Sequence, residues 1–352
     1  MIDIIELLKK AAEKNLSDLF ILAGTCICAK KGDMIIPLDD KRLLPADTEE
    51  IVTEIYKLEG GRSMATLLET GDDDFSVSIT GFGRFRCNAF RQRGSLSAVL
   101  RVVALTLPDY KELGIPDQVI DIYKKNKGLV LVTGSAGSGK STTLSCIVNK
   151  INKTRSTHII TIEDPIEYLH RHDKSIVSQR EVAQDTGSYT KALRAALRQA
   201  PNVILLGEMR DLETISTAMT AAETGQLVLS TLHTIGAANT IDRIIDVFDT
   251  GQQNQIRIQL SMVLQAVVSQ QLIPTVDGNV VPAFEIMFVN SAIRNLVREG
   301  KVHQIDNVIY SGGNEGMIAM DNDLLRLYRD GVISKENALL YSSNHDVMVK
   351  KL

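Results

Sequence analysis

Residues 134–141 read Gly134-Ser135-Ala136-Gly137-Ser138-Gly139-Lys140-Ser141 and fill every fixed position of the pattern G-x-x-x-x-G-K-[ST]. An apolar run, Leu129 to Thr133, comes directly before this stretch. Apolar residues at helical spacing follow it, at Leu144, Ile147, Val148 and Ile151. The order predicts a strand, a glycine-rich turn and the first turn of a helix. The alternative is a glycine-rich turn that precedes a helix and binds nothing.

Such a turn binds a nucleoside triphosphate through its backbone. Its glycines let N–H groups turn toward phosphate oxygens, and the helix N-terminus adds a partial positive charge. Lys140 is expected to neutralise the β- and γ-phosphates, and the Ser141 hydroxyl is expected to bind Mg²⁺. Residues 134–142, ending at Thr142, are therefore the predicted ATP-binding segment.

The residues after Gly128 alternate apolar runs with helical patterns, an order that predicts an α/β fold with a parallel sheet covered on both faces. The expected strands are Leu129 to Thr133, His158 to Ile162, Val203 to Leu206 and Leu227 to Leu232. From about residue 290 the pattern becomes helical, and the expected helices are Ala292 to Arg298, Asp321 to Arg329 and Ser334 to Tyr341.

Residues 1–105 have the mixed pattern of a smaller α+β domain. A helix is expected at Ile4 to Ala12, with strands at Leu19 to Leu22 and at Phe75 to Ile79, the latter after a turn at Gly71 to Asp74. Residues 84–93 alternate charged with apolar residues, which suits two strands that carry guanidinium groups on one face. Prolines then interrupt the pattern, which predicts a linker at 106–118 and a second domain at 119–352.

The composition excludes several functional classes. Lys plus Arg total 39 against 43 Asp plus Glu, a formal charge of −4, so binding to nucleic acid through a general basic surface is not expected. Neither a signal peptide nor a membrane-spanning run is recognisable, which predicts a cytoplasmic protein. The four cysteines are too few and too scattered for a disulfide framework, and no second pair completes a zinc site with Cys26 and Cys28.

Polar residues follow three of the expected strands, at the edge where ligands bind in open α/β sheets. Glu163 comes first after one strand and is placed to orient or deprotonate a water molecule, although a solvated acidic turn is the alternative. Glu208 follows Val203 to Leu206 and fits a Walker B carboxylate that reaches Mg²⁺ through water. His233 follows Leu227 to Leu232 and is either a γ-phosphate sensor or a structural histidine.

Together these segments resemble the Walker A, Asp box, Walker B and His box of the secretion ATPase superfamily, in the same order and at similar spacing. Within the superfamily, the chain most resembles the retraction ATPases of type IV pili along nearly its whole length. The stretch Ala292-Ile293-Arg294-Asn295-Leu296-Val297-Arg298-Glu299 is similar to a signature of those ATPases. Two segments depart from the family pattern: residues 199–202, which are neutral where relatives are acidic, and residues 304–313.

The resemblance implies a RecA-like ATPase domain that follows a PAS-like domain. By the same resemblance Glu163 acts on the attacking water, Glu208 supports Mg²⁺, and His233 links the nucleotide state to the neighbouring domain. Arginines of the first domain, among them Arg86, Arg93 and Arg101, would close over the γ-phosphate, where an inserted arginine can contribute about 10³–10⁵ in rate. For each of them the alternative is a solvated basic surface.

The resemblance also implies a homohexamer that hydrolyses ATP and drives pilus retraction through rotation between its domains. Such a ring would act at the inner face of the cytoplasmic membrane, on an inner-membrane platform protein of the pilus, and would reach the membrane only through partners. Three alternatives remain: a pilus-assembly or secretion ATPase, whose members typically carry a longer N-terminal region and a four-cysteine zinc site; a nucleotide-gated adaptor with little turnover; and a DNA translocase, which the acidic balance disfavours.

Overall fold

The computed structural model describes residues 3–14, 16–32, 34–79, 82–103 and 107–352. The chain divides into two compact units, Met1–Thr106 and Leu107–Leu352. We call them unit 1 and unit 2. Each unit buries a hydrophobic core of its own, so each is described by itself.

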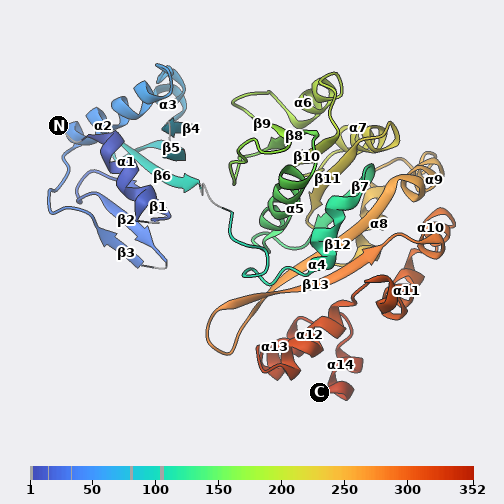
Figure 1. The fold of residues 1–352 in the computed structure, drawn as a ribbon. Helices are drawn as coiled ribbons and strands as arrows, with labels where there is room; N and C mark the ends of the chain where they lie inside the picture. Colours follow the sequence, from blue (N-terminus) through green and yellow to red (C-terminus); the bar gives the residue numbers. More distant parts are fainter. Residues whose placement is uncertain (1–2, 15, 33, 80–81, 104–106) are drawn as a thin grey trace. The chain divides into compact units, whose positions relative to one another are not determined.

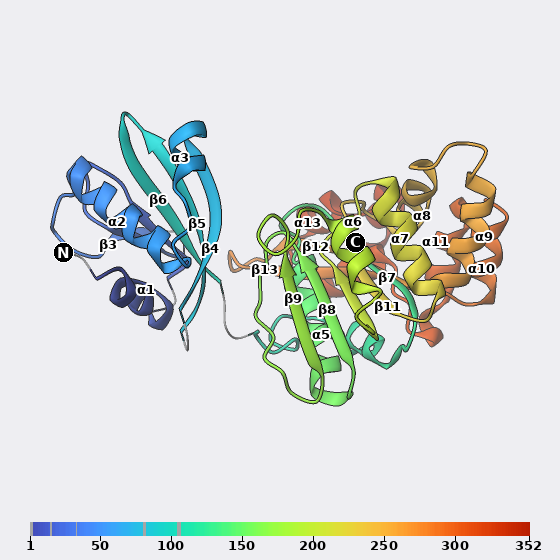
Figure 2. The same ribbon diagram turned by 90° about the horizontal axis from the view of Figure 1, so that it is seen from above.

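Unit 1 is a six-stranded sheet in the order β3-β2-β1-β6-β5-β4, in which every neighbouring pair is antiparallel. Helices α1 and α2 lie side by side, and α2 packs on β6 (Figures 1 and 2). Their apolar residues form one core with the sheet, which confirms the expected mixture of helices and strands. The strands are β1 (Asp18–Ile21), β2 (Cys28–Lys31), β3 (Met34–Pro37), β4 (Asp72–Ile79), β5 (Gly83–Gln92) and β6 (Ser95–Val103), and the helices are α1 (Ile4–Glu13), α2 (Pro45–Leu58) and α3 (Ala65–Thr70).

Two predictions for unit 1 were wrong in detail. Residues 72–74 begin strand β4 instead of a turn, because Asp73 is buried against Arg62, with which it forms an ion pair, and the Tyr56 hydroxyl. Residues 84–92 lie in one strand, β5, and not in two. The chain reverses only at Arg93 and Gly94, whose φ angles of 51° and 81° suit the two-residue turn into β6.

Unit 2 is a seven-stranded sheet in the order β13-β12-β7-β11-β10-β8-β9. All neighbouring strands are parallel except β12 and β13, which form a long antiparallel hairpin (Figure 1). The four expected strands are confirmed as β7, β8, β10 and β11, whereas β9, β12 and β13 were not anticipated. The strands are β7 (Gly128–Thr133), β8 (His158–Glu163), β9 (Ile176–Glu181), β10 (Val203–Leu206), β11 (Leu227–Leu232), β12 (Leu264–Pro274) and β13 (Val280–Phe288).

Helices cover both faces of this sheet, as the unbroken apolar strands predict. Along β7, Leu129 and Leu131 point into a core shared with α6 to α11, while Val130 and Val132 point into a second core with α4 and α5. The helices of the two faces are α4 (Asp117–Ile120), α5 (Lys140–Thr154), α6 (Tyr189–Ala196), α7 (Leu212–Glu223), α8 (Ala237–Asp246), α9 (Gln253–Val263), α10 (Ser291–Arg298) and α11 (Ile305–Ser311), with short 3₁₀ turns at Asp121–Lys124, Val302–Gln304 and Gly313–Glu315.

The ends of unit 2 pack on the same sheet. Residue 106 of the expected linker at 106–118 lies outside the described residues. Residues 107–118 belong to unit 2, where Leu107, Tyr110 and Leu113 pack against the core that contains α5. The C-terminal helices α12 (Met320–Arg329), α13 (Lys335–Leu340) and α14 (His345–Lys351) form a separate small core with Ile273 and Ala283 of the β12–β13 hairpin. The three expected C-terminal helices are thus confirmed as α10, α12 and α13.

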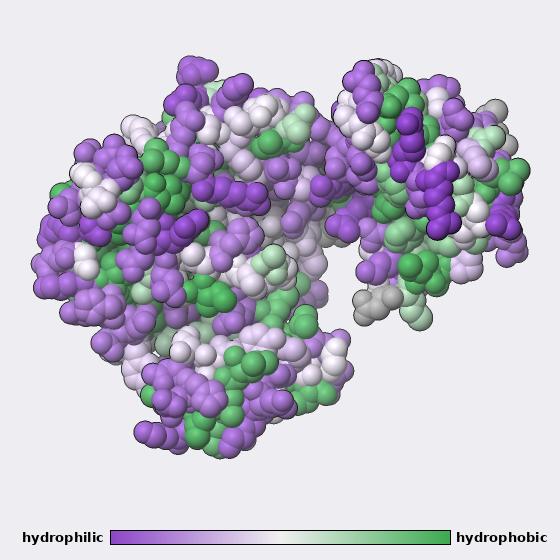
Figure 3. Space-filling model, turned by 180° about the vertical axis from the view of Figure 1, so that it is seen from behind, coloured by the Kyte–Doolittle hydropathy of each residue, from purple (hydrophilic) through white to green (hydrophobic). Residues whose placement is uncertain are grey.

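The surface of unit 2 in Figure 3 is mostly hydrophilic, with apolar residues in separate small areas. Exposed apolar side chains include Ile258, Met262 and Leu340. Within the residues described, no helix is long and apolar enough to cross a membrane.

Candidate active site

The parallel strands of unit 2 bring the predicted segments to one edge of the sheet. Leu206 of β10 pairs in register with Ile162 of β8 and with Ser230 of β11, and β11 continues in register to the end of β7. The residues that follow these strands therefore meet at their carboxyl ends. A cavity of about 450 Å³ lies there, lined by Ala136 to Thr142, Glu163, Asp164, Glu167, Tyr189, Glu208, Arg210, Thr231 and His233, among others.

The glycine-rich turn after β7 leads directly into α5. Gly139 has a φ of 84° and precedes the first residue of the helix, Lys140. A Cβ on Gly134 would collide with the Gln270 carbonyl oxygen, and a Cβ on Gly139 would lie 2.8 Å from the Gln270 Nε2. Glycine is therefore required at position 134 by the close approach of the β12 backbone and is favoured at position 139 by its positive φ.

Seven of the nine predicted nucleotide-binding residues, Ala136 to Thr142, line the cavity. Gly134 and Ser135 do not, but their carbonyl oxygens accept hydrogen bonds from the Lys140 Nζ, at 2.9 and 2.7 Å. Burial lowers the pKa of Lys140, while Glu208 and Glu167 act in the opposite direction. The turn thus holds the ammonium group through two carbonyl oxygens. A phosphate oxygen that enters the turn can replace these carbonyls as the acceptor of its hydrogen bonds.

Glu163 ends strand β8 and is 8% exposed. Its Oε1 accepts a hydrogen bond from the Thr161 hydroxyl at 2.6 Å and from the Gln179 amide at 3.3 Å. Burial raises the pKa of Glu163 to about 7, although both of these donors lower it. A carboxyl group with that pKa can accept a proton near neutral pH.

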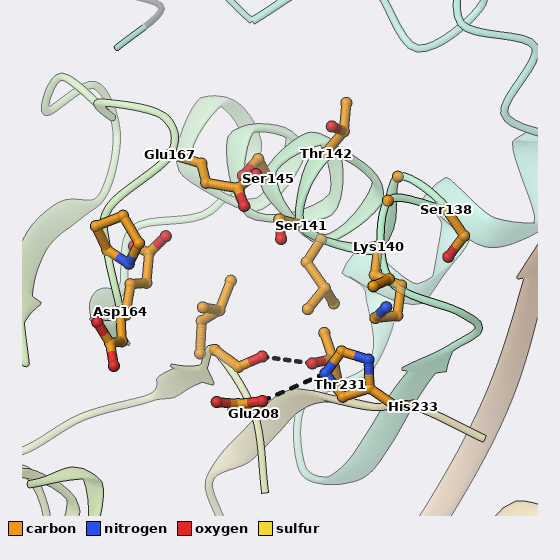
Figure 4. Close-up of a pocket in the computed structure, with 18 of the residues that line it drawn as sticks. Ser138, Lys140, Ser141, Thr142, Ser145, Asp164, Glu167, Glu208, Thr231 and His233 are labelled. Carbon is orange, nitrogen blue, oxygen red and sulfur yellow. Dashed lines mark hydrogen bonds and ion pairs between the residues drawn. The ribbon is translucent and has the colours of Figure 1, made fainter. Parts of the chain in front are cut away.

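Glu208 and His233 lie next to each other, joined by a dashed line in Figure 4, and line the same cavity as Lys140 and Ser141. The Glu208 Oε2 lies 2.7 Å from the Arg210 Nε and 3.4 Å from the His233 Nε2. The Thr231 hydroxyl donates to the Gly207 carbonyl at 2.5 Å, which joins the end of β11 to the residue before Glu208. Glu208 therefore pairs with the Arg210 guanidinium and also lies within hydrogen-bonding distance of the His233 ring.

The sequence did not indicate two side chains that shape this site. The Tyr189 hydroxyl would lie 2.7 Å from a Cβ on Gly207, which explains a glycine where many related motifs have aspartate. On α5, Thr143 donates to the Gln270 Oε1 at 2.7 Å and fixes the helix to β12. Both contacts join distant parts of the sequence, so no local pattern could have pointed to them.

The predicted arginines lie in unit 1. Arg86 and Arg101 are register partners on β5 and β6, and both line a small cavity of about 170 Å³ with Asp18 and Asp74. The Arg101 Nε lies 2.9 Å from the Asp18 Oδ1. Arg93 is exposed in the turn between the two strands, so it is separate from the other pair.

No cluster of three or more His, Cys, Asp or Glu side chains suited to a metal ion occurs in the part of the chain that the structure describes. The oxygen donors that line the cavity include the two predicted ligands, the Ser141 hydroxyl and the Glu208 carboxylate, and also the carboxyl groups of Glu163, Asp164 and Glu167. Hard oxygen ligands of this kind suit Mg²⁺ bound together with phosphate groups.

Comparisons with known proteins agree with this geometry. Residues 71–329 match the family described as type II/IV secretion system protein. The chain is 44% identical over 336 residues to the type IV pilus retraction ATPase PilT of Pseudomonas aeruginosa, covering 96% of this chain and 97% of that one. It is 49% identical over 276 residues to a twitching motility protein of Neisseria gonorrhoeae, covering 78% and 74%.

A solved structure supports the same assignment of fold. The crystal structure of the pilus retraction motor PilT with bound ADP superposes with a TM-score of 0.90 at 45% identity, and the match covers 99% of this chain and all of that one. The α/β fold expected for the nucleotide-binding residues is therefore confirmed.

Proposed function

The chain belongs to the type II/IV secretion system protein family, and from that premise we propose that it is the motor ATPase that retracts type IV pili. It is an ATPase that binds nucleotide at the glycine-rich turn after β7. The observation that carries the mechanism is Glu163, a buried carboxyl group with a pKa of about 7 that lines the same cavity as Lys140.

Hydrolysis joins a water oxygen to the γ-phosphorus and breaks the bond from that phosphorus to the oxygen that remains on ADP. Glu163 orients the water and accepts its proton, which its raised pKa permits at neutral pH. Lys140 exchanges its bonds to the Gly134 and Ser135 carbonyls for bonds to the β- and γ-phosphates. The attack thus takes place between a fixed cation and a buried base.

Mg²⁺ would be held by the Ser141 hydroxyl and, through water, by Glu208, and would neutralise charge on the phosphates. Arg210 and His233 keep the Glu208 carboxylate in place. His233 thereby connects the Mg²⁺ side of the site to the loop that leads into α8. We assign Arg86, Arg93 and Arg101 of unit 1 the role of stabilising charge that develops on the γ-phosphate.

The working assembly we propose is a homohexamer in which ATP binding and hydrolysis alternate two arrangements of the domains. A ligand can drive such a change only if it binds one arrangement more tightly than the other. The ring would act at the inner face of the cytoplasmic membrane on a platform protein of the pilus. The similarity of the chain to the pilus retraction motor is the basis for proposing this assembly and its place of action.

Two measurements test the function. In the source organism, Lys140→Ala should leave pili extended, and retraction events of labelled pili should disappear. In solution, the wild-type mass should correspond to six chains when a non-hydrolysable ATP analogue is present. Unchanged retraction in the Lys140→Ala strain, or a monomer with and without the analogue, would contradict the proposal.

A further inference from the structure

Two side chains on the β12–β13 hairpin hold the start of helix α8. Ser269 and Glu285 are register partners on the two strands. The Gly236 N–H donates to the Ser269 Oγ at 2.9 Å, and the Ala237 N–H donates to the Glu285 Oε1 at 2.7 Å. We call Ser269 and Glu285 the α8 clamp, because they accept two consecutive N–H groups at one helix end.

The clamp lies at the end of the loop that carries His233. This loop leaves β11 after Leu232 and enters α8 at Ala237, so only residues 233–236 separate the strand from the helix. Gly236, with a φ of 88°, makes the turn into the helix. Since the loop is fixed by β11 at one end and by the α8 clamp at the other, the clamp limits where the His233 ring can lie.

Glu285 is 8% exposed and forms no ion pair with Lys or Arg within the residues described. The Ala237 N–H at the start of α8 binds its carboxylate instead. Burial raises the pKa of Glu285 to about 7, while the backbone N–H groups of Ala237 and of Met320, at the start of α12, lower it. Both helix N-termini carry partial positive charge, which offsets the burial of the carboxylate. One side chain thus joins the loop of His233 to a C-terminal helix.

The backbone on both sides of Glu285 is bound to the same C-terminal segment. The Phe284 N–H donates to the Asp323 Oδ2 at 2.9 Å. Ile286 exchanges two backbone hydrogen bonds with Ile318, at 2.8 and 3.0 Å. A displacement of α12 is therefore transmitted to the Glu285 carboxylate.

We propose that Glu285 is a positioning residue that holds His233 beside Glu208 and couples the place of that histidine to helix α12. The inference rests on the proposed ATPase function, because its effect is on turnover. Nucleotide binding should change little, since the glycine-rich turn is held by separate contacts of Gln270 with Thr143 and of Lys140 with its own turn.

The first test is Glu285→Gln, measured as steady-state phosphate release by the full chain. The Gln amide oxygen can still accept the Ala237 N–H, but the side chain has lost the negative charge and the second acceptor oxygen of the carboxylate. The expected result is a fall in kcat of about 10-fold, the cost of one lost hydrogen bond to a charged group. KM for MgATP should stay within about threefold of the wild-type value, because the contacts of the glycine-rich turn are intact.

A double mutant separates a positioning role from a general loss of stability. In a His233→Ala background, Glu285→Gln should cause no further fall in kcat, because the residue through which it acts is already absent. Asp73→Asn is the control: it also alters a buried, hydrogen-bonded carboxylate, but Asp73 lies on β4 of unit 1 and is no part of the contacts that join Glu285 to α12. Its kcat should stay within about threefold of wild type.

Each outcome decides the question. A Glu285→Gln enzyme with wild-type kcat, a loss that adds to that of His233→Ala, or an equal loss in Asp73→Asn would overturn the inference. If Glu285→Gln does not fold, Ser269→Ala takes its place, with a several-fold fall in kcat expected and the same double-mutant test. A wild-type chain that binds MgATP without hydrolysing it would instead refute the proposed function.

Discussion

Strands β8 and β10 end side by side at one edge of the sheet, and each places a glutamate at the same cavity, but the two carboxyl groups have opposite surroundings. Glu163 is buried beside neutral donors, the Thr161 hydroxyl and the Gln179 amide. Glu208 lies between Arg210 and His233. The first environment raises the pKa of a carboxyl group by burial, whereas the second places a carboxylate next to a guanidinium group and an imidazole ring.

This difference separates two tasks of phosphoryl transfer. A base needs a pKa near the working pH, whereas a group that supports Mg²⁺ needs a permanent negative charge. Similar sequence context, a glutamate just after an apolar strand, therefore yields two roles, and the neighbours decide between them. Substitutions at the site can show whether the roles are as distinct as the surroundings.

Lys140→Ala should have the largest effect, because it removes the cation proposed to neutralise the β- and γ-phosphates. Turnover should fall by about 10³-fold or more, and MgATP affinity should fall as well. Lys153→Ala is a matched control, since this residue lies on the same helix but is exposed and far along it. Phosphate release and nucleotide titration measure the two effects. Turnover in Lys140→Ala close to that of Lys153→Ala would show that the turn after β7 does not hold the phosphates.

Glu208→Gln should lower turnover less, by about 10²-fold, and should raise the Mg²⁺ concentration needed for half-maximal activity. The amide cannot carry the charge that Arg210 and His233 balance. The measurement is phosphate release over a series of Mg²⁺ concentrations. An unchanged Mg²⁺ requirement would mean that Glu208 has no part in binding the ion and that the comparison with Glu163 is wrong.

The smallest effect concerns stability and pH. The pKa of Glu163 is raised to about 7 in the folded chain, above its ordinary value of 4.5, so the folded state binds the proton more tightly than the unfolded state. The raised pKa adds about 3 kcal/mol to the free energy of unfolding at low pH. This stabilisation is present in full below pH 4.5 and is lost as the pH rises to about 7. Glu285, with the same raised pKa, adds a similar contribution.

Urea unfolding at about pH 5 and at about pH 7.5 measures this loss of stability, because Glu163 releases most of its proton between these two pH values. The free energy of unfolding should decrease less between the two pH values in Glu163→Gln than in wild type. Glu336→Gln, at an exposed position, should keep the wild-type difference. Equal differences in all three proteins would contradict the buried state of Glu163.

The sequence was sufficient to predict the four central strands of unit 2. It was not sufficient to predict β9, β12 and β13, toward the two edges of the sheet. Strands β7, β8, β10 and β11 are short apolar runs buried on both faces, and each leads into a local motif, so their position and their polar ends could be predicted. The hairpin β12–β13 carries polar residues such as Gln270 and Glu285, and its pairing joins residues distant from the motifs it supports. No local periodicity reveals such contacts.

Unit 1 shows a second limit of the same reasoning. Asp72 to Asp74 have the composition of a turn, but tertiary pairing of Asp73 with Arg62 places them in a strand. Likewise Arg86 and Arg101 were predicted from a resemblance to a family, and the structure shows where they lie in unit 1 without showing what they bind. Their role on the γ-phosphate stays a prediction.

The contrast between the two glutamates depends above all on one claim. Glu163 acts on the attacking water and has no part in binding the nucleotide. MgATP affinity and single-turnover hydrolysis of Glu163→Gln, measured side by side with wild type, separate these two roles. We expect affinity within about threefold of wild type and hydrolysis slower by at least about 10²-fold. Hydrolysis near the wild-type rate, or loss of MgATP binding, would show that Glu163 is not the base.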